Sequence, residues 1–127
     1  MVFDMSEVNA LAEELVQSDA KVREEGKRVV KRGAMNVKRS ARNAIVGSAG
    51  MGHPKWYPTS IDFDLDDSGL AAEIGPREGV GKQGFLGKIL EYGTATSPPH
   101  PHMNPAADEE EPRMQDAVAR MVKRALS

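Results

Sequence analysis

The 127-residue chain contains no cysteine. That absence excludes a disulfide scaffold, a thiolate metal site and a cysteine nucleophile, and it fits a protein that assembles in a reducing cytosol. Aromatic residues are also scarce, at 5% of the chain, whereas methionine occurs seven times. Because flexible methionine side chains fill gaps without specifying one packing arrangement, the composition predicts a small and adaptable core.

Long apolar runs are missing as well. No stretch approaches the ~20 apolar residues that a membrane-spanning helix needs. The first residues, MVFDMSEVNALAEEL, contain no basic segment followed by an apolar one, so we expect no signal peptide. The length favours a single domain over residues 1–127.

The sequence lacks the common catalytic motifs. No GxxxxGK[ST] or GxGxxG lies between an expected strand and helix, and HExxH and GxSxG do not occur. Asp62, Asp64 and Asp66 alternate along an expected strand. Paired carboxylates can perform acid–base chemistry or bind divalent cations, but regular alternation is typical of a solvated strand face. We therefore expect no catalytic residue and no enzyme activity.

The three histidines are His53, His100 and His102. The last two flank Pro101, and a spacing of two places both side chains on the same side of an extended segment, where they could bind a metal together. Because prolines surround them and no cysteine assists, the pattern favours histidines that pack within a surface arm. We expect no metal and no cofactor.

Charge is distributed unevenly along the chain. Residues 21–45 hold nine Lys/Arg and two Glu, a charge of +7, so the rest of the chain carries −9 to give the net −2. The cations that flank the apolar stripe of this segment form two sets: Lys27, Lys31, Lys38 and Arg42, and Arg28, Arg32 and Arg39. Both sets could contact DNA phosphates without reading sequence. They could equally form a solvated face, or pair with acidic patches of a neighbouring subunit.

Hydrophobic periodicity and turn residues predict the order of elements. The expected elements are helices at 6–17 and 20–45, a loop at 46–59, strands at 61–65, 70–74 and 88–93, a mobile glycine-rich loop at 77–87, and a C-terminal helix from Pro105 that kinks or restarts at Pro112. This order predicts an α+β fold, in which a long N-terminal helix and a C-terminal helix pack on a small antiparallel sheet. Three strands would leave two open edges, which favour pairing with another chain.

The most distinctive stretch is LEYGTATSPPHPHMNPA, residues 90–106. Four of its residues are prolines, at positions 98, 99, 101 and 105. Each proline fixes its own φ and biases the preceding residue toward extended geometry. The stretch therefore predicts a stiff, exposed, proline-rich arm at residues 94–104, which suits a protein that is one part of an assembly.

An EYGT box, a PPHPHMNPA segment and a terminal helix, in this order, resemble the phage tail-completion family named after the gene-ten product of a lambdoid siphophage. The upstream segments GAMNVKRSARNAI, HPKWYPTSI and AEIGP fit the same pattern, so the resemblance covers residues 6–126. It implies a structural virion protein at the head-proximal end of the tail, acting in tail completion, tail termination or head–tail joining. The expected form is a hexameric ring around a DNA lumen.

The resemblance also implies partners and a location. The partners would be further copies of the chain in a hexamer, the adjacent head–tail connector and tail-tube proteins, and double-stranded DNA in transit, with no membrane. The protein would be assembled in the host cytoplasm and reside in the tail or neck of the virion. The candidate assembly contacts are Glu91, Tyr92, Gly93, Thr94, Pro98, Pro99, His100, Pro101 and His102. The alternative function is non-sequence-specific binding of nucleic acid through the basic helix 21–45.

Overall fold

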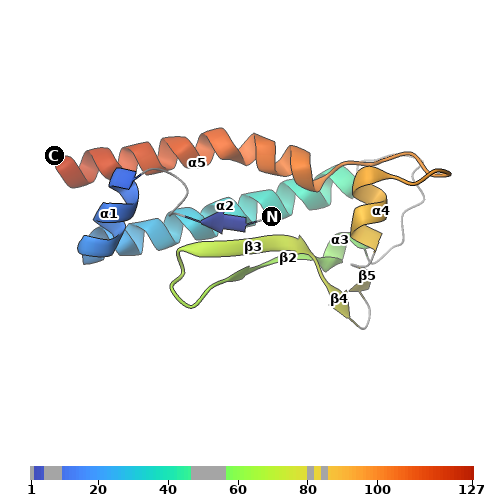
Figure 1. Cartoon of the computed structure of the whole chain (residues 1–127), viewed down its shortest axis with the longest axis horizontal. Helices are drawn as coiled ribbons and strands as arrows, with labels where there is room; N and C mark the ends of the chain where they lie inside the picture. The colour runs from blue at the N-terminus through green and yellow to red at the C-terminus, as the bar shows by residue number, and fades with distance from the viewer. Residues whose placement is uncertain (1, 5–9, 47–56, 80–81, 84–85) are drawn as a thin grey trace.

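In a computed structural model of the chain, the structure describes residues 2–4, 10–46, 57–79, 82–83 and 86–127. The elements in chain order are β1 (Val2–Asp4), α1 (Ala10–Ser18), α2 (Ala20–Val46), α3 (Tyr57–Ser60), β2 (Ile61–Leu65), β3 (Ala71–Pro76), β4 (Glu78–Gly79), β5 (Lys82–Gln83), α4 (Gly87–Tyr92) and α5 (Met103–Leu126). Helix α2 lies between α5 and the sheet (Figure 1). The predicted α+β class is confirmed.

Helix α2 is the central element of the fold, because it contacts α1, α5 and the sheet. Its 27 residues form a rod about 40 Å long. The helix starts at a capping residue, because the Asp19 carboxylate accepts hydrogen bonds from the backbone N–H groups of Lys21 (2.9 Å) and Val22 (3.3 Å). Most of the apolar stripe predicted for residues 20–45 is buried between Val22 and Ile45, and Val29 is half-buried.

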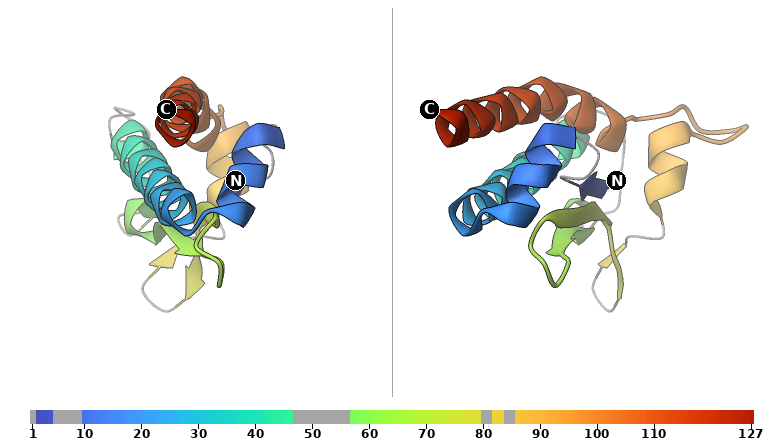
Figure 2. Two further views of the ribbon diagram at one scale, coloured as in Figure 1. Left: turned by 90° about the vertical axis from the view of Figure 1, so that its left-hand side faces the viewer. Right: turned by 60° about the vertical axis from the view of Figure 1, so that its left-hand side comes forward.

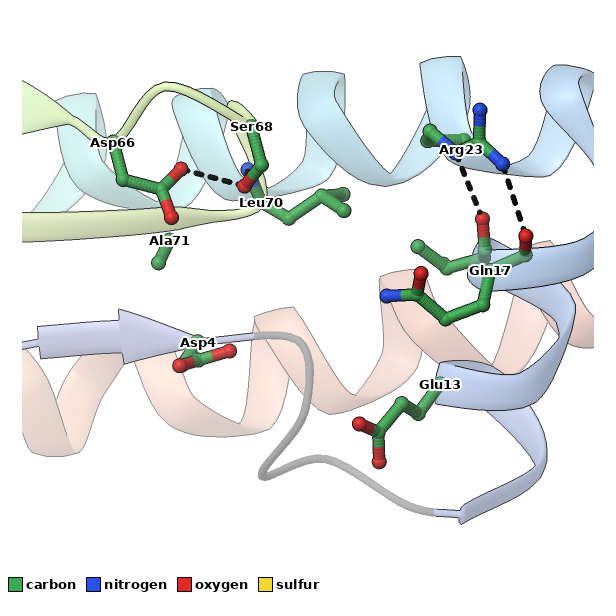
Figure 3. A pocket seen from close by; sticks show the side chains of 9 residues that line it. Asp4, Glu13, Gln17, Arg23, Asp66, Ser68, Leu70 and Ala71 are labelled. Atoms are coloured by element: carbon green, nitrogen blue, oxygen red, sulfur yellow. Dashed lines mark hydrogen bonds between the residues drawn. The ribbon is translucent and has the colours of Figure 1, made fainter.

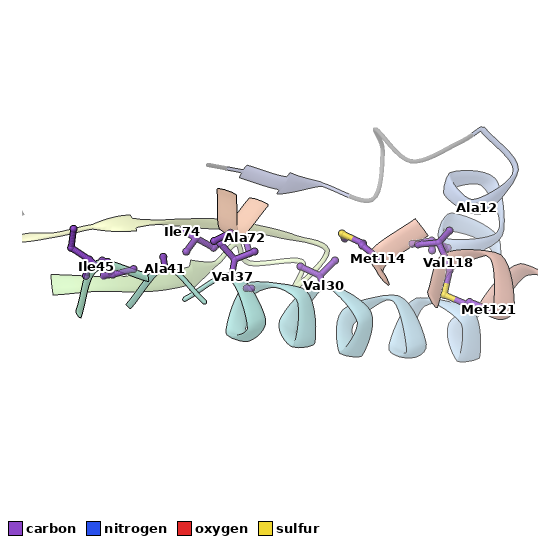
Figure 4. Close-up of a cluster of buried hydrophobic side chains, with 14 of the residues drawn as sticks. Ala12, Val30, Val37, Ala41, Ile45, Ala72, Ile74, Met114, Val118 and Met121 are labelled. Carbon is purple, nitrogen blue, oxygen red and sulfur yellow. The ribbon is translucent and has the colours of Figure 1, made fainter. Parts of the chain in front are cut away.

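The core follows α2 along its length. The side chains drawn and labelled in Figure 4 are Val30, Val37, Ala41 and Ile45 of α2, Ala72 and Ile74 of β3, Met114, Val118 and Met121 of α5, and Ala12 of α1. Toward the C-terminal end of α2 the stripe meets β3, and toward its N-terminal end it meets α1 and α5 (Figure 4). The apolar stripe therefore packs against the sheet toward one end of α2 and against α1 and α5 toward the other.

The main sheet has three antiparallel strands in the order β1-β3-β2. The predicted β2–β3 hairpin forms, and its turn contains Gly69 at φ +75°, a backbone conformation that favours glycine. The strand that completes the sheet is β1, which pairs Val2 with Glu73. Sequence reasoning missed β1 because three residues are too few to show a period of two.

The predicted strand at residues 88–93 is wrong, because residues 88–92 belong to helix α4 and Gly93 follows its last residue. Its buried residues, Gly87 and Glu91, are four apart, as one face of a helix requires. A short apolar run does not distinguish strand from helix, which explains the error. Gly87 is needed here: a Cβ at this position would lie 2.6 Å from Cγ of Pro76, so only glycine allows α4 to approach the end of β3.

Two other predicted segments differ from the structure. Part of the glycine-rich segment 77–87 is regular, because β4 and β5 pair as a two-stranded antiparallel sheet; residues 80–81 and 84–85 lie outside the described residues, and the expected mobility remains a prediction. Of the predicted loop 46–59, residues 47–56 lie outside the described residues as well, and α3 follows them.

Helix α5 starts at Met103, two residues before Pro105, so the arm ends at His102 and not at residue 104. The helix continues through Pro112 without restarting. A proline inside a helix leaves the carbonyl four residues earlier without its donor. Both Pro112 and Asp108 are exposed, so water can supply that hydrogen bond. Among the helices of the described residues, none combines the length and the apolar character needed to cross a membrane.

Candidate functional site

The arm between α4 and α5 projects beyond the helices at one end of the molecule (Figures 1 and 2). Residues 94–99 are exposed. Its two ends are held together at the base, where the backbone N–H of His100 donates to the carbonyl of Leu90 at 2.6 Å. The arm is therefore a closed protrusion.

Beyond its base, the arm forms a turn over residues 93–99 whose first position requires glycine. Gly93 has φ 76° and ψ −177°, and a Cβ there would lie 2.8 Å from both the Pro99 nitrogen and the Ser97 oxygen. The Thr94 backbone N–H donates to the Ser97 carbonyl at 2.9 Å. The Thr94 hydroxyl accepts hydrogen bonds from the N–H groups of Thr96 (3.3 Å) and Ser97 (3.1 Å). The chain therefore folds back tightly onto Gly93.

Glu91 connects α4 to the start of α5. The residue is only 6% exposed. Its carboxylate accepts hydrogen bonds from three consecutive backbone N–H groups, those of His102 (3.1 Å), Met103 (2.8 Å) and Asn104 (3.2 Å). The first N–H groups of a helix have no partner within the helix, and an anion there is favoured by the helix dipole. Glu91 therefore caps α5 from outside the helix.

His102 extends this connection to α3. Its Nδ1 atom lies 3.0 Å from the carbonyl oxygen of His100 and 3.1 Å from Glu91 Oε1. Because both neighbours are acceptors, Nδ1 carries the proton. In the neutral imidazole, Nε2 accepts from the hydroxyl of Tyr57, which lies 2.6 Å away. Burial of the tyrosine, with the Glu91 charge nearby, raises the pKa of the Tyr57 hydroxyl, which keeps its proton.

The hydrogen-bonded series Tyr57, His102 and Glu91 holds α3, α4 and α5 together. Tyr57 and His102 are completely buried, and both ring nitrogens of His102 have partners within the protein. No nitrogen of His102 is left for a metal. We call these three residues, together with Gly93, the arm lock. Sequence reasoning gave Tyr57 no role; the only signal was that Tyr57 is one of the few aromatic residues of the chain.

The structure divides the nine candidate assembly contacts into two groups. Glu91 and His102 are buried and belong to the arm lock, as does Gly93, and His100 is half-buried. The exposed ones are Tyr92, Thr94, Pro98, Pro99 and Pro101. Tyr92 is 68% exposed at the base of the arm. A contact with another molecule would therefore involve the tip and Tyr92, while the buried members hold the arm in place.

The two sets of cations on α2 lie on different sides of the helix. In the first set, Lys38 pairs with Asp62 at 3.0 Å, and Arg42 donates to the carbonyl oxygens of Ile61 (2.9 Å) and Thr59 (3.2 Å). Burial alone would raise the pKa of Asp62, but the Phe63 N–H and Lys38 lower it. Lys27 pairs with Glu24 at 2.9 Å. These cations hold the sheet or their own helix, whereas Lys31 is exposed.

The second set lines a groove of about 1060 Å³ between α2 and α5. The arginines of this groove are Arg28, Arg32 and Arg39 of α2, and Arg113, Arg120 and Arg124 of α5. We call it the arginine groove. Arg113 pairs with Glu109 and Glu110, and Arg124 pairs with Glu25. The other four make no hydrogen bond or ion pair with any of the residues that the structure describes. The sequence could not indicate the arginines of α5, because it does not give the register of the two helices.

A smaller hollow of about 310 Å³ lies between β1, α1, α2 and the β2–β3 turn (Figure 3). Asp4, Glu13 and Asp66 line it. Arg23 crosses from α2 to the end of α1, donating to the carbonyl oxygens of Val16 (3.1 Å) and Gln17 (3.0 Å). In the part of the chain that the structure describes, no three His, Cys, Asp or Glu side chains are grouped so as to hold a metal ion.

Comparison of the chain with protein-family models, with curated proteins and with solved structures gave no match. The two surfaces that remain for a functional argument are the exposed tip of the arm and the arginine groove. They lie on different elements, since the arm connects α4 to α5 and the groove runs between α2 and α5.

Proposed function

We propose that the chain is a structural subunit of a phage tail, which completes, terminates or joins the head-proximal end of the tail as a ring around the DNA lumen. The observation that carries the proposal is the locked arm. Three buried side chains and one glycine hold a projecting segment in a single shape, although its residues 94–99 make no part of the core. This architecture, together with the sequence resemblance, supports a role in assembly.

The physical argument concerns conformational entropy. A flexible segment loses much freedom when it docks, which weakens the contact, whereas a segment that is already ordered loses little. Prolines at positions 98, 99 and 101 restrict the arm further. Tyr92 and Ile89 expose apolar surface beside its base, at 68% and 44%. The arm is therefore prepared for a contact before the partner arrives.

The position of the arm favours a ring. If the arm of one copy contacts a different patch on the next copy, the contact is head-to-tail, and repeated head-to-tail contacts close into a ring or extend as a filament. The outer edges of β1 and β2 have no neighbouring strand within the described part of the chain, so they offer a further place for pairing. The partners would then be further copies of the chain, in a hexamer, with connector and tail-tube proteins above and below.

The test is assembly of the purified protein, followed by sedimentation velocity and negative-stain imaging. We expect rings for the natural sequence and loss of rings for Tyr92→Ser. Leu126→Ser is the matched control, because Leu126 is a similarly exposed apolar residue (64%) at the far end of α5. Replacing the three arm prolines by glycine should leave the subunit folded and weaken assembly. Monomers at the highest soluble concentration, or rings that are indifferent to both arm variants, would contradict the proposal. Labelling of the protein in isolated tails anywhere other than the head-proximal end would contradict the location.

A further inference from the structure

We propose that the arginine groove binds the phosphate backbone of nucleic acid without reading its base sequence. The groove belongs to a single chain, so this inference does not depend on ring formation. It also differs from the expectation based on the basic helix alone, because half of the arginines come from α5 and the lysines of α2 are not part of it.

The register of α2 and α5 builds the groove. The helices run antiparallel, because Asn36 donates to Glu110 at 3.0 Å near one end and Arg124 pairs with Glu25 near the other. Arg28 and Arg32 lie between these two contacts on one wall, and Arg120 lies between them on the other. None of the three makes a hydrogen bond or ion pair with the described residues. Guanidinium groups from two helices therefore face one hollow without a partner.

The chemistry of the groove favours phosphate. All of its cations are arginines, and a guanidinium presents a planar fork of donors that matches two phosphate oxygens. The lysines of α2 that make contacts, Lys27 and Lys38, face Glu24 and the sheet instead. From Arg28 to Arg39 the helix rises by about 16 Å, which is the axial rise of about five nucleotides of one strand. The arginines thus follow a line that a phosphate backbone can follow.

Three carboxylates share the groove, and they do not cancel its charge. Six arginines against Glu25, Glu110 and Asp116 leave +3. Glu25 and Glu110 hold Arg124 and Arg113 in place. Asp116 makes no hydrogen bond or ion pair with the described residues and is exposed. It is therefore the one carboxylate in the groove that would repel a phosphate directly, which makes it useful in a test.

An acidic segment of a second copy is the other occupant to consider. The densest acidic stretch of the chain, residues 108–111, lies on α5 itself, and two of its members already pair with Arg113. A separate acidic peptide with a comparable charge density would be a disordered chain that loses conformational entropy on binding. The observations therefore favour nucleic acid.

The experiment measures the affinity of a fluorescent 20-base-pair duplex by anisotropy over a series of salt concentrations. Arg32→Gln combined with Arg39→Gln removes two groove charges. Lys21→Gln combined with Lys31→Gln removes two exposed charges from the same helix outside the groove. We expect the groove pair to lower affinity about 10-fold or more at low salt and to reduce the slope of log K against log salt by about 1.8, at about 0.9 per phosphate contact. The control pair should change affinity less than about 3-fold, through the net charge alone.

Asp116→Asn gives a test in the opposite direction, with an expected gain in affinity of about 2-fold or more from the lost repulsion. Thermal unfolding of each variant shows whether it is folded. Equal losses for the two pairs would mean that only the overall charge matters, and they would overturn the proposal. So would a lack of binding by the natural sequence at low salt, or competition by poly-glutamate as strong as by unlabelled DNA.

Discussion

Removing the charge of Glu91 should destabilise the whole domain although it leaves the shape of the side chain unchanged. In Glu91→Gln, the amide oxygen can still accept from the first turn of α5, but the amide NH2 group is a donor and must face an N–H group of the helix. At least one of the three N–H groups at 2.8–3.2 Å, of which that of His102 is buried and the other two are part-buried, then loses its acceptor. An unsatisfied buried donor costs about 1–3 kcal/mol, and loss of the anion at the helix start costs about 0.3–1 kcal/mol more.

We therefore expect Glu91→Gln to lower the free energy of unfolding by about 2–3 kcal/mol. For a domain of this size, that corresponds to a fall in Tm of roughly 10 °C. The assay is urea and thermal unfolding followed by circular dichroism. Glu14→Gln is the control, because Glu14 is exposed on α1 and should stay within about 0.5 kcal/mol. A loss below about 0.5 kcal/mol for Glu91→Gln would refute the capping role.

Two more variants examine the arm and the sheet. Gly93→Ala should lower the free energy of unfolding by about 2 kcal/mol or more, because the positive φ strains any other residue and the added Cβ would meet backbone atoms of Ser97 and Pro99 at 2.8 Å. The control is Gly75→Ala, where a Cβ meets nothing within 4 Å, and it should be neutral or stabilising in the same unfolding assay. Equal effects of the two variants would contradict the tight turn. The pKa of Asp62 is lowered in the folded protein, so its stabilising contribution is present above the unfolded pKa near 3.8 and disappears as the pH falls below that value. The difference in unfolding free energy between the natural sequence and Asp62→Asn should therefore shrink below pH ~4, and a constant difference from neutral to acid pH would contradict this linkage.

The long elements were predictable because their signals are local and repeated. In α2, apolar residues recur at helical spacing over several turns. The helix begins next to a capping residue, Asp19, that is its neighbour in the sequence. Helix α4 has only six residues, and its apolar residues fit the period of a strand as well as that of a helix. The sequence therefore specified the two long helices and the hairpin, and it left the connection between them ambiguous.

The candidate site was predictable only in part, because its contacts are distant along the chain. The pattern of α2 grouped its cations into two sets, of which the structure places one near the sheet and the other along the groove with α5. The capping of α5 by Glu91 joins residues 11 to 13 apart, and the bond from Tyr57 to His102 joins residues 45 apart. Neither pairing can be read from spacing, since each depends on how α3, α4 and α5 meet in space. For that reason Glu91 and His102, which the sequence suggested as surface contacts, proved to be buried.

The arm lock also bears on domain swapping. Helix α5 is attached to the rest of the chain through the arm, and a connection of this length could act as a hinge that lets α5 dock on α2 of a second copy. Opening the hinge would break the bond from His100 to Leu90, the turn at Thr94 and the fold-back onto Gly93. These contacts oppose such an exchange, so in any association of copies we expect each copy to keep its own C-terminal helix.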